Sequence, residues 1–120
     1  MALKKLSPPQ ISGILPAFTI GGEQSSTISI PFILNYSVGA KDFDRIAIII
    51  KTVSTGIEKL RTTTTNFQFD DVKRCYIAHF PCFEDAQIGQ YYKIQIACQL
   101  GEDDNGVGYY SSVGVAKCTS

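Results

Sequence analysis

The chain has 120 residues, enough for one domain with its own hydrophobic core and too few for two. Lys and Arg together equal Asp and Glu, 11 against 11, so the formal net charge is zero. Nucleic-acid-binding proteins usually gather excess basic residues to neutralise phosphates, so this balance argues against a nucleic-acid partner. With 44% hydrophobic and 18% charged residues, the chain is too apolar to be disordered and too polar for a membrane protein. We therefore expect a soluble globular domain.

The composition favours β-structure, because 15 Ile, 6 Val and 9 Thr stand against only 6 Leu. Side chains branched at Cβ lose rotamer freedom in helices and fit the pleated surface of a sheet. The Gly and Pro residues are spread along the chain, as expected for short strands separated by turns. The sequence therefore predicts an all-β domain.

We interpret residues 1–7 as an N-terminal arm and residues 8–120 as one β domain. Lys4 and Lys5 are not followed by an apolar stretch long enough for a secretory signal. The longest aliphatic run, Ile46–Ile50, is five residues long, whereas a membrane span needs about 20. We expect no secretion signal, no membrane insertion and a reducing compartment, in which the cysteines stay free and mostly buried. The four cysteines are Cys75, Cys82, Cys98 and Cys118.

The first half of the domain predicts three apolar strands. Residues 8–18 open with Pro-Pro and contain Pro16, which predicts an edge strand because proline cannot donate to a ladder. In residues 28–34 alternate positions are apolar, and the central Pro31 indicates an edge position or a bulge. Residues 46–50 are apolar on both faces, which predicts a strand covered by a second sheet and flanked within its own.

Residues 58–65 predict a polar strand at a sheet edge. The segment carries Lys59 and Arg61 and ends in a run of threonines. Charged side chains on an edge strand discourage uncontrolled pairing of its backbone. An edge strand can also accept a strand from another subunit, so Lys59, Arg61, Thr63 and Thr65 are partner-binding candidates.

Alternation continues in the second half of the chain. Residues 66–70 and 75–79 both alternate, so one or both are strands, and their pairing stays open. The clearest strand is 92–98, with Lys93, Gln95 and Gln99 on one face and apolar residues on the other, at positions 92, 94, 96 and 98. The turn 101–106 contains Asn-Gly, the strongest short hairpin signal.

The final strand is predicted over residues 109–117, with Val113 and Val115 facing inward. Together these segments make seven or eight strands, with turn signals every 8–12 residues. This spacing predicts a single antiparallel two-sheet sandwich.

The segment Gly89–Cys98, the Gly-rich turn after it and Gly108–Ser111 resemble the last two strands of a fibronectin type III or immunoglobulin-like domain. In such domains a Tyr near the start of the penultimate strand buries its ring and bonds its hydroxyl to nearby backbone, and Tyr92 has the matching parity. Residues 8–11 resemble the proline-led first strand. The chain departs from the family in having no Trp, so Phe32 is expected to fill the space of the second-strand Trp.

A second resemblance is to small proteins and accessory domains of tailed-bacteriophage virions, and residues 2–13 and 108–115 carry it. This resemblance implies a structural or adhesion module of a capsid, tail or baseplate, assembled in the host cytoplasm. Its partners would be other virion subunits or further copies of itself, and its mechanism would be docking.

Metal and catalytic chemistry have little support in the sequence. Cys75, His79 and Cys82 have a C-x3-H-x2-C spacing that could offer zinc ligands, but the remaining cysteines are separated by a whole hairpin. Cys75 and His79 would lie roughly 13 Å apart along a strand, too far for a nucleophile and its base. With no carboxylate pair placed for acid–base work either, we expect no enzyme, no metal and no other cofactor.

Aromatic side chains near the last hairpin are the remaining candidates. Tyr109 and Tyr110 follow the hairpin turn, and Asn105 lies within it. Exposed tyrosines contribute large contact areas at low entropic cost, so these residues are candidates for contact with a partner. They also suit sugars, and the alternative function is therefore a carbohydrate-binding accessory module that recognises a cell-surface glycan through its loop tyrosines.

Overall fold

The computed structural model describes residues 9–11, 18–19, 27–34, 43–84, 86–101 and 108–119. Over these ranges the chain forms nine β-strands and no α-helix, which confirms the all-β prediction. The strands are β1 (Gln10–Ile11), β2 (Phe18–Thr19), β3 (Thr27–Ile33), β4 (Arg45–Thr52), β5 (Glu58–Thr64), β6 (Phe67–Asp70), β7 (Cys75–Pro81), β8 (Tyr91–Gln99) and β9 (Gly114–Thr119). No helix in the described ranges is long and apolar enough to cross a bilayer.

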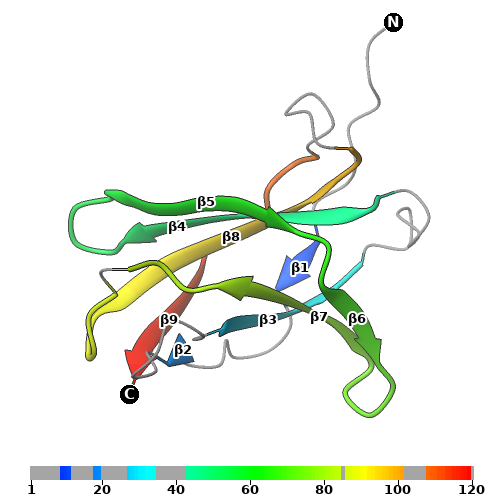
Figure 1. Ribbon diagram of the computed structural model, residues 1–120, viewed down its shortest axis with the longest axis horizontal. Helices are drawn as coiled ribbons and strands as arrows, with labels where there is room; N and C mark the ends of the chain where they lie inside the picture. Colours follow the sequence, from blue (N-terminus) through cyan, green and yellow to red (C-terminus); the bar gives the residue numbers. More distant parts are fainter. Residues whose placement is uncertain are drawn as a thin grey trace, which may run out of the picture.

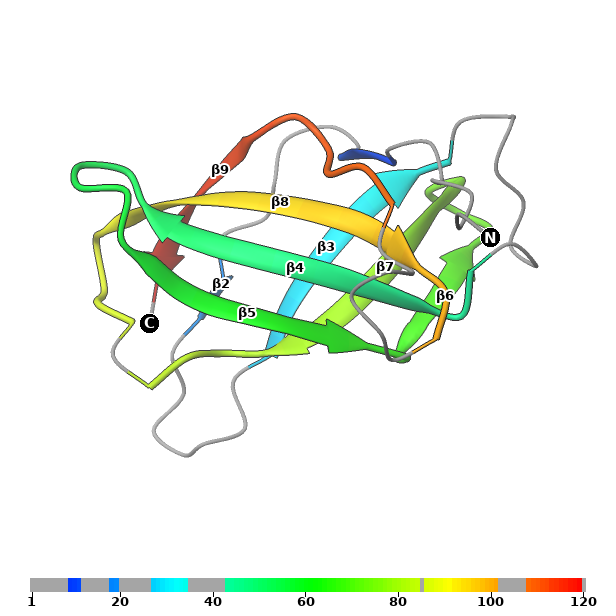
Figure 2. The same ribbon diagram turned by 90° about the horizontal axis from the view of Figure 1, so that it is seen from above.

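The strands form two sheets that face each other (Figure 1). One sheet has the order β1-β3-β7-β6, and the other has the order β2-β9-β8-β4-β5. Figure 2 shows β5, β4, β8 and β9 as one layer, with β3 and β7 lying behind it. The predicted two-sheet sandwich is therefore confirmed.

The core lies between the sheets and is built from alternate residues of four strands. β4 and β8 pair antiparallel, and their inward residues meet as Ile48 opposite Ile96 and Ile50 opposite Ile94. β3 and β7 cover them from the other sheet, and Phe32 of β3 is fully buried, as expected. The largest fully buried apolar side chains of these strands are Ile28, Ile30, Phe32, Ile46, Ile48, Ile50, Phe80, Ile94 and Ile96.

The proline-rich opening segment forms two short strands where we expected one. β1 lies at the edge of the first sheet and β2 at the edge of the second, so the predicted edge position is right for both. β2 pairs with β9 in the parallel sense, whereas all the other described strand pairs are antiparallel, as the predicted antiparallel sandwich requires. β1 and β2 thus belong to different sheets.

Pro31 lies inside β3 without a bulge. It stands opposite Ile77 of β7, and the register between these strands is continuous. On the other side of β3, the two residues of β1 pair only with Phe32 and Ile33. Among the described residues Pro31 has no partner in β1, so its missing N–H removes no described pairing on that side, although β3 itself lies between β1 and β7.

The structure settles the pairing that the sequence left open. β6 and β7 form an antiparallel hairpin, and β7 also pairs with β3. The last strand was predicted one residue out of phase. Val113 and Val115 are each half exposed, whereas Ala116 and Cys118 are buried, because Val115 pairs with Lys93 on the outer face of β8.

We expect Phe32→Ala to destabilise the protein by about 3–5 kcal/mol, because it removes a fully buried ring at the centre of the sandwich and leaves a cavity. Urea unfolding at equilibrium measures the loss. Val72→Ala is the control, since Val72 is 92% exposed at the tip of the β6–β7 hairpin, and it should change stability by less than about 0.5 kcal/mol. Similar losses for both variants would contradict this assignment of the core.

Candidate functional site

Tyr92, at the start of β8, closes the corner between the two sheets. Its ring is buried, and its hydroxyl oxygen accepts a hydrogen bond of 3.1 Å from the backbone N–H of Gln87. Phe83 packs edge-on against the ring, with 5.1 Å between the centroids. The hydrogen bond expected of Tyr92 is therefore confirmed. It fixes residues 86–90 against the end of the sheet.

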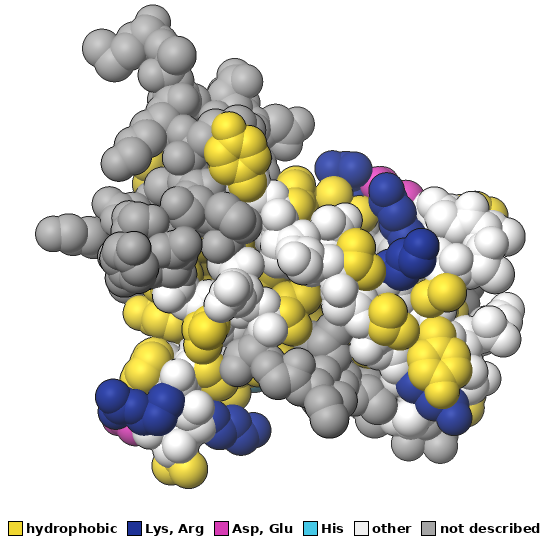
Figure 3. Space-filling model, turned by 180° about the vertical axis from the view of Figure 1, so that it is seen from behind, with side chains coloured by type: hydrophobic (Ala, Val, Ile, Leu, Met, Phe, Trp, Pro, Cys, Tyr) yellow, Lys and Arg dark blue, Asp and Glu magenta, His cyan; other side chains and the backbone are white. Residues whose placement is uncertain are grey.

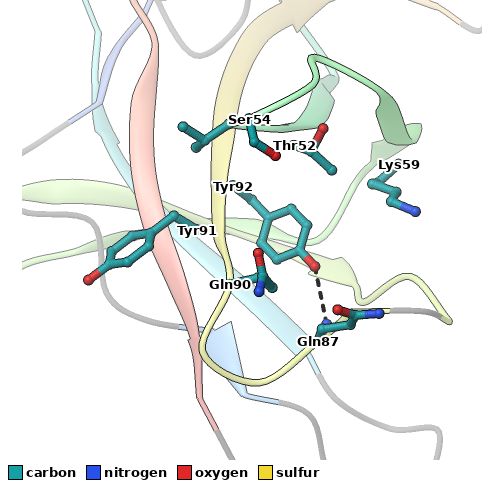
Figure 4. A pocket seen from close by; sticks show the side chains of 8 residues that line it. Thr52, Ser54, Lys59, Gln87, Gln90, Tyr91 and Tyr92 are labelled. Atoms are coloured by element: carbon teal, nitrogen blue, oxygen red, sulfur yellow. Dashed lines mark hydrogen bonds between the residues drawn. The ribbon is translucent and has the colours of Figure 1, made fainter.

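A hollow of about 350 Å³ lies beside this corner. One wall comes from the turn between β4 and β5, and the other comes from the segment that leads into β8 (Figure 4). Figure 4 shows the ring of Tyr92 reaching toward Gln87, whereas the ring of Tyr91 points away over β9. The lining residues are Thr52, Val53, Ser54, Lys59, Gln87, Gln90, Tyr91 and Tyr92.

Hydrogen bonds hold the first wall of the hollow. In the β4–β5 turn, the Thr52 hydroxyl accepts a bond of 3.0 Å from the N–H of Ile57, and the Gly56 N–H donates to the Thr52 carbonyl. Gly56 has a φ of 71°, a conformation that glycine adopts without the strain a side chain would bring.

The second wall is also fixed by backbone bonds. The Gln90 N–H donates to the Gln87 carbonyl at 3.1 Å. Two further bonds tie this segment to β9, from Gly89 N–H to the Cys118 carbonyl at 2.8 Å and from Cys118 N–H to the Gln90 carbonyl at 2.9 Å. The hollow is therefore preformed.

The outer face of the five-stranded sheet is basic. Lys51 of β4 stands directly opposite Lys93 of β8. On the neighbouring strand β9, the ammonium of Lys117 lies 5.8 Å from the centroid of the Tyr91 ring. The sequence of β4, β5, β8 and β9 contains one carboxylate, Glu58. The Lys and Arg residues of these strands are Arg45, Lys51, Lys59, Arg61, Lys93 and Lys117.

β5 is the edge strand of this sheet, as predicted. Arg61 donates two hydrogen bonds to one carboxylate oxygen of Glu58, at 2.8 and 3.0 Å, and these bonds hold the pKa of Glu58 below its ordinary value. Of the partner-binding candidates named from the sequence, Arg61, Thr63 and Thr65 are exposed and Lys59 is half-buried at the hollow. The structure thus brings four of the candidates to one edge.

The tyrosine candidates lie apart from this edge. Tyr109 is 59% exposed and Tyr110 is half-buried, and both precede Ser111, whose N–H donates to the Ile96 carbonyl near the far end of β8. Asn105 and the N-terminal arm, residues 1–7, lie outside the described residues. The tyrosines and the β4–β5 turn therefore belong to opposite ends of the sheet.

The C-x3-H-x2-C residues do not converge. Residues 76, 78 and 80 of β7 pack inward, so Cys75 and His79 belong to the other face, while Cys82 packs against the core. His79 Nδ1 and the hydroxyl of Ser29 are hydrogen-bonded at 2.9 Å, as suits a half-buried strand histidine. Among the described residues, no three His, Cys, Asp or Glu side chains gather as metal ligands would.

All four cysteines are free thiols, as expected, and three of them are buried. Burial raises the pKa of the Cys98 thiol to about 12, since the interior disfavours a thiolate. It also raises the pKa of Cys82 and Cys118. These side chains act as small apolar groups of the interior.

No protein-family model matches the chain, and comparison with curated proteins finds no similar sequence. Sequence reasoning missed the hollow because its walls, residues 52–59 and 87–92, lie about 30 positions apart in the chain. No periodicity links these two walls, so only the strand pairing shows that they meet.

We expect Tyr92→Phe to destabilise the protein by about 1 kcal/mol, because the Gln87 N–H loses its acceptor while the ring stays in place. Tyr91→Phe is the matched control, since Tyr91 is exposed, and it should change stability by less than about 0.5 kcal/mol. Urea unfolding compares the two variants. Equal effects would show that the hydroxyl of Tyr92 does not hold the corner.

Stability should fall in alkaline solution, and Cys98 should account for part of the fall. Its pKa of about 12 in the folded protein lies above the value near 8.5 of an unfolded thiol. Protonated Cys98 therefore contributes stability that is complete below about pH 8.5 and is lost as the pH rises toward its folded pKa. The decline in the urea midpoint between about pH 8 and about pH 10 should be shallower in Cys98→Ala than in the wild type. Parallel declines would contradict the assignment.

Proposed function

We propose that this protein is a non-enzymatic structural or adhesion module that docks through β5 onto a second copy of itself. The supporting observation is the position of β5 at the edge of the five-stranded sheet, with exposed polar side chains along it. An edge strand presents a row of backbone groups to solvent, and another strand can add to that row. Such addition would join two five-stranded sheets into one.

The charges of β5 favour a second copy as the occupant. When two identical strands pair antiparallel about the midpoint between Lys59 and Leu60, Glu58 of each strand stands opposite Arg61 of the other. The internal Glu58–Arg61 ion pair is then exchanged for two ion pairs between copies. The resulting contact has two-fold symmetry and is closed, as in most dimers of identical chains.

The setting we propose is a tailed-bacteriophage virion, as the resemblance of residues 2–13 and 108–115 implies. The strand order adds support for an accessory domain of the immunoglobulin-like kind. One sheet has the order β1-β3-β7-β6, and the other contains the order β9-β8-β4-β5. These orders match strands A-B-E-D and G-F-C-C′ of immunoglobulin-like sandwiches. Contacts with other virion subunits and assembly in the host cytoplasm belong to the same proposal.

A charge-swap series tests the docking surface. Light scattering at several concentrations should show the wild type passing from monomer to dimer. Glu58→Arg should weaken this association by about tenfold or more, because each ion pair between copies becomes a repulsion. Adding Arg61→Glu to the same chain restores opposite charges across the contact and should restore the dimer.

Asp71→Arg is the matched control, because it changes the net charge equally at an exposed site on the β6–β7 hairpin. It should dimerise like the wild type. A wild type that stays monomeric at every concentration would contradict the proposal. So would a double variant that associates no better than Glu58→Arg alone.

A further inference from the structure

The outer face of β8 and β9 carries apolar and basic side chains next to one another. Tyr91, Val113 and Val115 are each half exposed, although all three are large and largely apolar. In the strand register Lys93 stands opposite Val115, and Lys117 stands opposite Tyr91. Both lysines are exposed as well. Apolar side chains gathered on a surface among polar groups are typical of a binding site.

The charge of this face has one sign. Neither β8 nor β9 contains an Asp or a Glu. Along the row that includes Lys93, the first carboxylate is that of Glu58 on β5, and Lys51 of β4 stands between them. Lys51 and Lys93 are direct neighbours of like charge, and an anionic partner would relieve their repulsion. Figure 3 shows basic and apolar side chains together on the right of the view, with little Asp or Glu among them.

The residue types favour a lipid surface over a protein or a nucleic acid. The basic groups of these two strands are lysines, which are depleted at protein interfaces. A lysine ammonium is a compact charge that needs no fixed partner geometry, as suits a fluid layer of headgroups. Tyrosine is enriched where lipid meets water, because one end of its side chain is apolar and the other polar. A phosphate backbone would leave Val113 and Val115 without an apolar partner.

We propose that the outer face of β8 and β9 binds the surface of a lipid bilayer that contains anionic headgroups. Lys93 and Lys117 pair with the lipid phosphates, while Tyr91, Val113 and Val115 enter the headgroup layer. The contact is peripheral, because only side chains of one sheet face reach the lipid. It is also independent of self-docking, since none of these residues lies on β5.

Vesicle composition tests the role of charge. The full-length protein is sedimented with vesicles of phosphatidylcholine alone, and with vesicles of phosphatidylcholine and phosphatidylglycerol in equal amounts. We expect the partition coefficient to be at least about tenfold larger for the anionic vesicles, because each lysine near such a surface contributes roughly a fivefold gain. Salt should reduce the preference, since it screens the attraction.

Lysine variants test the named side chains. Lys93→Gln and Lys117→Gln should each weaken binding to the anionic vesicles by about fivefold, and the double variant by about 25-fold. Lys73→Gln is the matched control, because it removes the same charge from an exposed site on the β6–β7 hairpin of the other sheet. It should bind like the wild type.

A tryptophan reporter locates the contact without relying on affinity. The chain contains no Trp, so one introduced Trp accounts for all tryptophan emission. With anionic vesicles the emission of Val115→Trp should move to shorter wavelength, because the indole leaves water. Val72→Trp is the control, since Val72 is exposed at the tip of the β6–β7 hairpin, and its emission should stay unchanged.

Four results would overturn the proposal. Equal binding to both kinds of vesicle would remove the role of the lysines. Release of the protein from the vesicles by soluble polyglutamate at matched charge would show a surface that prefers acidic polypeptides to lipid. A shift in the emission of Val72→Trp without one in Val115→Trp would place the contact on another face. Failure of the wild type to bind anionic vesicles at low salt would contradict the site directly.

Discussion

The pairing of β4 with β8 is the constraint on which the rest of the molecule depends. Alternate isoleucines of both strands face the core, and Ile48 meets Ile96 directly. A slip of one residue would turn these side chains to solvent, so burial fixes the register. The same register then determines the outer face. Once Ile50 is opposite Ile94, Lys51 must stand opposite Lys93 and Thr52 opposite Tyr92. The packing of the core thus positions Thr52 and Tyr92, two of the residues that line the hollow.

Tyr92 closes a corner of the sandwich at the position that this register gives it. The residue is the first inward-facing member of β8, so its hydroxyl reaches the end of the sandwich where β7 returns toward β8. By accepting the Gln87 N–H, it holds a segment without regular structure in one conformation. The same phenol therefore closes the fold and supports a wall of the hollow.

The strands that sequence reasoning predicted well are those whose burial alternates strictly. Residues 92–98 alternate between apolar and polar except at Ala97, and β8 forms there. The edge position of residues 58–65 was equally predictable, because a strand that carries Lys, Arg and several threonines does not suit the centre of a sandwich. The last strand was misread because Ala116 and Cys118, the small residues, face inward while the larger Val115 faces solvent. Side-chain size alone did not reveal its phase.

The candidate site was hidden for a different reason. Ser54 and Gln87 show no periodicity, and their meeting depends on which strands become neighbours. The neutral net charge also concealed how unevenly charge is distributed, because basic residues concentrate on one sheet while most carboxylates of the chain lie elsewhere. Composition reports the sum of the charges, whereas recognition depends on where the fold places them.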